Sequence, residues 1–170
     1  MNQWGSTTYG DPCGECDFLW TTAVSSAIEY MHHYPLAIGE LVEGRTGTEQ
    51  HPDLDWTVSE YVLHVADNLR IWAERLVGVQ GRGSHVVGGY DERVLADARN
   101  YKSLPIEAAL WSLNRSVGDW LTAVEDTPKT GVIMIHPDRG ELELSDVVLS
   151  NTHDARHHEW DIKRTLVESN

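Results

Sequence analysis

Four segments of this 170-residue chain repeat their apolar residues with the period of an α-helix. The clearest begins at Thr57-Val58-Ser59-Glu60, which has the form of a helix-starting capping box. Its apolar stripe follows at helical spacing and consists of Val58, Tyr61, Val62, Val65, Leu69, Trp72 and Leu76. A helix with one apolar face must bury that face against another element. A chain with four such stripes is therefore expected to fold as a bundle of helices.

The other predicted helices are separated by breaks that contain glycine or proline. One covers about residues 18–42, and Pro35 should kink or split it near Tyr34. The remaining helices are expected at about 90–104, 106–124 and 145–167. Glycine-rich stretches at 44–52 and 78–89 are predicted to be loops.

One stretch departs from the helical period. Residues 132–135 form a short β-rich run, 136–140 have turn composition, and 141–144 alternate between polar and apolar. A small hairpin is therefore expected before the last helix. The whole pattern predicts an all-α fold, a four-helix bundle with this hairpin, in a single domain over 1–170. Residues 1–16 would form an N-terminal arm that contains two cysteines.

The charge balance excludes several classes of partner. The net charge is −14, from 27 acidic and 13 basic residues, and no cluster of Lys or Arg interrupts it. Such a surface repels nucleic acid and anionic lipid, so neither is expected to bind. The start of the chain lacks signal-peptide features, and no apolar run is long enough to span a membrane. A cytoplasmic protein with a small-molecule substrate is expected; bundles of this kind can form a homodimer, but no exposed apolar stripe requires it.

The two cysteines, Cys13 and Cys16, are separated by two residues. A zinc site would need two further ligands, and a redox pair with this spacing usually follows a strand, which is not predicted here. We expect reduced thiols in an N-terminal loop. A redox function or a second metal site is the alternative.

The strongest chemical signal lies in the last predicted helix. From His153 to Asp161, six of the nine residues are His, Asp or Glu. A helix places residues four positions apart on one face, which groups His153 with His157 and Asp154 with His158. The two pairs point in different directions, so the apolar stripe of the helix can decide which pair faces the bundle.

That stripe consists of Leu144, Val148, Ala155, Ile162 and Leu166. His158 lies about 60° from its centre, with Asp154 about 100° and Asp161 about 120° away. His153 and His157 fall about 160° away, on the far face. We therefore expect Asp154 and His158, with Asp161 as a third candidate, at the edge of the buried face, and His153 and His157 largely in solvent.

The same test applied to the Thr57 helix places His64 about 100° from the stripe centre at Val65, again at the edge of the core. A lone histidine there is usually just hydrogen-bonded, and a His-rich helix can be a solvated face. Together they favour a divalent metal held by His64, Asp154 and His158, with His157 and His153 as alternatives. Three protein ligands leave open positions for water or substrate, as catalytic sites require.

Residues Trp56 to Asp67 resemble the W-S-x-x-E-x-x-x-H-x-x-D signature of the DinB-like superfamily, with Thr57 in place of Ser. The segment His153 to Ile162 is similar to that family's last-helix motif, in which His or Glu is followed by His four residues later and by Gln or Asp three residues after that. The resemblance implies a four-helix bundle with a divalent metal on three side chains. Position by position it implies His64, Asp154 and His158 as ligands and Asp161 as the last motif position. Asp154 departs from the usual Glu or His.

The resemblance also implies a class of reaction. Some members, such as mycothiol-dependent maleylpyruvate isomerase, use the metal to bind a low-molecular-weight thiol, whose thiolate attacks an electrophile. We therefore expect a metal-dependent enzyme with transferase or isomerase chemistry on a small molecule, with zinc as the metal, although nickel, iron or manganese would suit these ligands. Asp161 would take part by orienting His158. Arg156 and Arg164 are the candidates to contact an anionic thiol cofactor, with a solvated face as the alternative for both.

The alternative function is a non-catalytic binding or resistance module on the same bundle. The tryptophans on predicted helices would suit a binding groove, although most are expected in the core. In either case the pocket walls are expected from the loop 78–89 and the hairpin 130–144, because these segments border the helices that carry the ligands.

Overall fold

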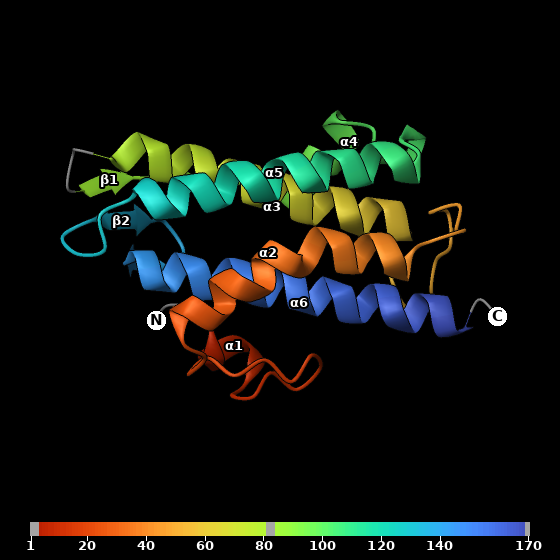
Figure 1. The fold of residues 1–170 in the computed structure, drawn as a ribbon, viewed down its shortest axis with the longest axis horizontal. Coiled ribbons are helices and arrows are strands. Elements are labelled where there is room, and N and C mark those ends of the chain that lie inside the picture. The colour runs from red at the N-terminus through yellow and green to blue at the C-terminus, as the bar shows by residue number, and fades with distance from the viewer. Residues whose placement is uncertain (1–3, 81–83, 169–170) are drawn as a thin grey trace.

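The computed structural model describes residues 4–80 and 84–168, so residues 1–3 of the predicted arm and 81–83 of a predicted loop lie outside it. Four long helices form the body of the fold and lie alongside one another in Figure 1: α2 (Val24–Leu41), α3 (Val58–Val79), α5 (Ile106–Asp126) and α6 (Leu144–Glu168). Helix α2 packs against α5 and α6, and α3 packs against the same two helices. The predicted four-helix bundle is confirmed.

Helix α3 begins where its capping box predicts. The Glu60 backbone N–H donates to Thr57 Oγ1 at 3.4 Å, and the Thr57 backbone N–H donates to Glu60 Oε2 at 2.9 Å. These two bonds satisfy donors that the first turn of a helix leaves free. The apolar stripe of α3 is buried against the other helices, as its period predicts.

Two predicted helices have different bounds in the structure. Helix α2 begins at Val24 rather than near Phe18, because Phe18 packs with the cysteines of the arm instead of with the bundle. Pro35 lies inside α2 and does not split it, although Figure 1 shows the helix changing direction along its length. The helix expected at 90–104 is replaced by α4 (Glu92–Ala98) and a single 3₁₀ turn, η1 (Tyr101–Ser103). Asn100, with a left-handed φ of 52°, separates the two.

The predicted hairpin is confirmed as β2 (Ile133–His136) and β3 (Gly140–Leu142), paired antiparallel with Met134 opposite Leu142. A third strand was not predicted. The strand β1 (Ser84–Val86) lies in the expected loop and pairs parallel to β2, with Ser84 opposite Ile133. Three residues are too few for an alternating pattern to be recognised, so the strand depends on its partner.

The N-terminal arm extends in the structure to the start of α2, over residues 4–23, and folds back over the bundle. It contains the short helix α1 (Ser6–Tyr9) and lies beside α6 in Figure 1. Phe18 and the two cysteines are buried there, with Trp20, Leu149 and Trp160 packed around them. The arm thus covers a face of α6 that the sequence pattern left to solvent. Among residues 4–80 and 84–168, no helix combines the length and the apolar character needed to cross a membrane.

Candidate functional site

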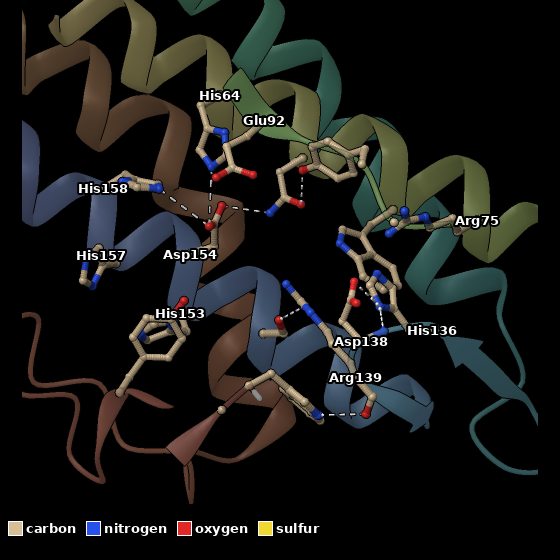
Figure 2. Close-up of a pocket in the computed structure, with 18 of the residues that line it drawn as sticks. His64, Arg75, Glu92, His136, Asp138, Arg139, His153, Asp154, His157 and His158 are labelled. Atoms are coloured by element: carbon tan, nitrogen blue, oxygen red, sulfur yellow. Dashed lines mark hydrogen bonds and ion pairs between the residues drawn. The ribbon is translucent and has the colours of Figure 1, made fainter. Parts of the chain in front are cut away.

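The three predicted metal ligands lie together between α3 and α6. His64 comes from the middle of α3, while Asp154 and His158 lie one turn apart on α6, and Figure 2 shows all three pointing toward one another. Asp154 Oδ1 lies 3.6 Å from His64 Nε2 and 3.6 Å from His158 Nε2. One ligand atom from each of the three lies within 4.8 Å of the others. The short side chain of Asp154 therefore reaches both imidazoles.

Neighbouring side chains hold this group in place. Asn68 Nδ2 donates to Asp154 Oδ2 at 2.8 Å, and the Tyr90 hydroxyl donates to Asn68 Oδ1 at 3.0 Å. His158 Nδ1 lies 3.0 Å from Asp161 Oδ2. A carboxylate in this position favours the tautomer with its proton on Nδ1, which leaves the lone pair of Nε2 available to a metal ion. The predicted role of Asp161 as a partner of His158 agrees with this contact.

The electrostatics of the group suit a cation. Burial alone would raise the pKa of Asp154, but His64, His158 and the hydrogen bond from Asn68 hold it well below the usual range. Burial would lower the pKa of His64, yet the neighbouring Asp154 raises it. Asp154 is thus a carboxylate at neutral pH, and positive charge is stabilised beside it.

The group opens onto a cavity of about 450 Å³. As expected, the segment before α4 and the β2–β3 turn contribute to its wall, through Gly89 and through His136, Asp138 and Arg139. The N-terminal arm contributes as well, which the sequence did not predict. Aromatic side chains line the cavity from the N-terminal arm, from α3 and the residues before it, and from the segment before α4: Trp4, Tyr9, Trp20, Trp56, Trp72 and Tyr90. Two other tryptophans lie outside the cavity and differ in exposure: Trp120 is buried, whereas Trp111 is 72% exposed.

Two arginines that sequence reasoning missed, Arg75 and Arg139, line this cavity at the end away from His64 (Figure 2). The Arg75 guanidinium lies 4.4 Å from the Trp72 ring centre, and its Nη1 is buried without a hydrogen-bond partner. Arg139 Nη1 donates to Ser150 Oγ at 2.7 Å. The signal for Arg75 was present, because it lies only about 20° around α3 from His64. Arg139 sits in a turn, where no such period applies.

The two arginines predicted to contact a cofactor, Arg156 and Arg164, are not among the residues that line the cavity. Arg156 Nε donates to the Cys16 carbonyl at 3.2 Å and so joins α6 to the arm. Arg164 Nη2 lies 3.4 Å from Asp161 Oδ1, with its guanidinium over the Trp160 ring. Neither arginine therefore lines this cavity, and their predicted contact with a cofactor stays a prediction.

The prediction that His153 and His157 are largely solvated is wrong. His153 is only 4% exposed, and the rings of Tyr9, Phe18 and Trp20 lie against it, with centroids 4.6, 5.4 and 4.7 Å away. Both histidines reach the rim of the cavity, but they group with Cys13 and Cys16 rather than with His64. The helical period located the far face of α6 correctly and gave no sign that the arm covers it.

Comparisons with known proteins agree with this architecture. A search of curated proteins found no match. The fold is similar to that of YfiT from Bacillus subtilis, described as a probable metal-dependent hydrolase with an unusual four-helix bundle topology; the TM-score is 0.78, at 20% identity over 97% of this chain and 98% of that one. Residues 27–161 match the sequence profile of the DinB superfamily. The chain therefore belongs to the DinB superfamily.

Proposed function

We propose that this protein is a divalent-metal-dependent enzyme acting on a small anionic molecule in the cavity between α3, α6 and the N-terminal arm. The observation that carries the proposal is the convergence of His64, Asp154 and His158 at one end of a cavity that has two arginines at its other end. Superfamily membership and the fold shared with YfiT support it.

The residues present fit a metal. Two imidazole nitrogens and a carboxylate oxygen are ligands that zinc, nickel, iron and manganese accept, and a set of three leaves coordination positions free. When bound there, such an ion would lower the pKa of a coordinated thiol or water and so supply a nucleophile at neutral pH.

The chain's own residues would perform the remaining tasks. Asp161 keeps His158 in one orientation, and Asn68 does the same for Asp154. Aromatic side chains in the wall lower the local dielectric constant, which strengthens charge interactions beside them. Arg75 and Arg139 would bind carboxylates, because a guanidinium matches the geometry of that group.

For the nucleophile we propose a low-molecular-weight thiol of mycothiol type, in transferase or isomerase chemistry. Two guanidinium groups in a cavity of about 450 Å³ suit a carboxylate-bearing thiol together with an electrophile. The second candidate is hydrolysis by water, which the fold shared with YfiT favours. A binding module without turnover is the third outcome of the same experiment.

The test uses the full-length protein loaded separately with zinc, nickel, manganese or iron. Each form is incubated with a panel of physiological thiols and electrophiles, and with ester and amide substrates in the absence of thiol. The first panel should show consumption of the electrophile that depends on both the metal and the thiol. The variant His64→Ala/His158→Ala should lose this activity together with one equivalent of metal by elemental analysis.

A matched control is His32→Ala/His33→Ala, which removes two exposed histidines from α2 and should change neither the metal content nor the activity. Turnover in the second panel alone would replace the thiol with water as nucleophile. Tryptophan quenching by the same compounds without turnover would overturn the enzyme proposal in favour of a binding module. Full metal content in the His64→Ala/His158→Ala variant would overturn the site itself.

A further inference from the structure

A second group of metal-ligand side chains lies where the N-terminal arm meets α6. It consists of Cys13 and Cys16 from the arm and His153 and His157 from α6. One ligand atom from each residue lies within 4.8 Å of the other three. The spacings are Cys-x₂-Cys and His-x₃-His, which are the spacings of structural zinc sites. The two further ligands that the cysteine pair lacked in the sequence come from the far end of the chain.

We propose that these four residues bind a structural zinc ion that fastens the N-terminal arm to α6. A tetrahedral zinc with sulfur and nitrogen ligands places its ligand atoms about 3.3–3.8 Å apart. Cys13 Sγ and His157 Nδ1 are already 3.9 Å apart. Closing the remaining gaps requires only side-chain shifts of about an ångström, in keeping with the bond lengths of zinc.

The surroundings of the group are those of a closed site. Cys13, Cys16 and His153 are 1%, 6% and 4% exposed. The Nε2 atom of His153 is buried and has no hydrogen-bond partner, which is costly unless something unseen binds it. A buried, unpaired imidazole nitrogen beside two thiols is accounted for by a metal ion.

The outer contacts also fit. His157 Nε2 lies 3.1 Å from Glu15 Oε2, which leaves Nδ1 free to face Cys13. Histidines that bind metals commonly donate their other N–H to a carboxylate in this manner. The turn that carries the cysteines is closed by backbone hydrogen bonds from Cys13 to Phe18 (2.8 Å) and from Asp17 to Cys13 (3.1 Å). Both thiols lie next to the histidines of α6.

The ion would have a consequence for the cavity. The arm supplies Trp4, Tyr9 and Trp20 to the cavity wall, and Trp4 Nε1 donates to the Arg139 carbonyl at 3.2 Å. Fastening Cys13 and Cys16 to α6 therefore fixes one wall of the proposed active site. This zinc would act on structure, since four protein ligands leave no open position for substrate.

Cobalt binding to the metal-free, reduced full-length protein tests the proposal. Cobalt replaces zinc in such sites, and its bonds to thiolates give an intense charge-transfer band with tetrahedral d–d bands. As each Co–S bond forms, one thiol proton is released to solvent. The wild-type protein should show these bands, and zinc should abolish them while protecting both cysteines from a thiol reagent.

Variants separate this site from the one in the cavity. His64→Ala/His158→Ala should keep the thiolate band, whereas Cys13→Ser/Cys16→Ser should lose it and bind one equivalent less zinc. If the cysteine variant does not fold, the wild-type spectrum and thiol protection decide the matter without it. A cobalt spectrum without thiolate bands, thiols equally reactive with and without zinc, or a Cys13–Cys16 disulfide in the purified protein would overturn the proposal. None of these results depends on turnover, so the proposed activity can fail while the zinc site stands.

Discussion

One face of α6 presents Asp154 and His158 to α3, and another presents His153 and His157 to the N-terminal arm. Both pairs have the same four-residue spacing, and each residue of one pair is followed directly by a residue of the other. The two pairs therefore lie within two turns of one helix. The ring centroids of His157 and His158 are only 5.6 Å apart. The faces differ in what lies opposite them.

Opposite the first face is the single imidazole of His64 and an open cavity, which gives three nitrogen and oxygen ligands with room for a reactant. Opposite the second face are two thiols and a hydrophobic cluster, which gives four ligands and leaves no coordination position free. Softer sulfur ligands and a closed shell favour a structural ion, while the open set favours a catalytic one. The chemistry of each face thus depends more on the segment that packs against it, α3 or the N-terminal arm, than on α6 itself.

The largest expected effect comes from removing a ligand on the cavity face alone. His158→Ala should weaken metal binding there by more than about 100-fold, because one of three protein ligands is lost and Asp154 keeps a single imidazole partner. Isothermal titration of the variant with zinc would measure this. The thiolate–cobalt band of the arm face should be unchanged, and a parallel loss of that band would show that the two faces are one site.

A smaller effect is expected from Asp161→Asn, which keeps the size of the side chain and removes its charge. Asp161 is buried and accepts a hydrogen bond from His158 Nδ1 at 3.0 Å. The substitution should therefore make the His158 imidazole less basic and less firmly oriented. Metal affinity on the cavity face should fall about 10- to 100-fold in the same titration. An unchanged affinity would mean that Asp161 serves the fold through Arg164 instead of serving the metal.

A third change acts on α3, which contributes a ligand to the cavity face only. Thr57→Ala removes the capping hydroxyl and should lower the free energy of unfolding by about 1 kcal/mol. Urea denaturation of the metal-free protein would measure it, with Thr122→Ala, an exposed threonine on α5, as a control expected to stay within about 0.5 kcal/mol of wild type. Equal effects of the two substitutions would contradict the role of the capping box.

These comparisons also separate what the sequence could predict from what it could not. Helix α3 was predictable because its start is encoded locally, by Thr57 and Glu60, and its buried face by a regular stripe. The same period distinguished the two faces of α6 and selected Asp154 and His158 for the side next to His64. Each of these inferences needs only residues that are neighbours on one helix.

The failures share a different physical origin. His153 and His157 were expected in solvent because a helical period identifies only the face that packs against the bundle. It contains no information about the arm, whose Cys13 and Cys16 lie some 140 positions earlier in the chain. Strand β1 was missed for the same reason, since its three residues pair with β2 across a long separation. Contacts between distant segments with weak local patterns are set by packing, which a single sequence does not display.

The smallest expected effect tests the outer contact of the arm face. Glu15→Gln removes the charge beside His157 Nε2, but the Glu15 side chain is 54% exposed, so solvent already weakens its influence. Zinc affinity of the arm face, measured by competition with a chromogenic chelator, should fall less than about tenfold, below the range for buried partners of metal-bound histidines. Glu29→Gln, an exposed glutamate on α2, should leave the affinity unchanged. A loss as large as that of Asp161→Asn on the other face would mean that zinc binding buries Glu15, and the arm would then close further over α6 than the present contacts show.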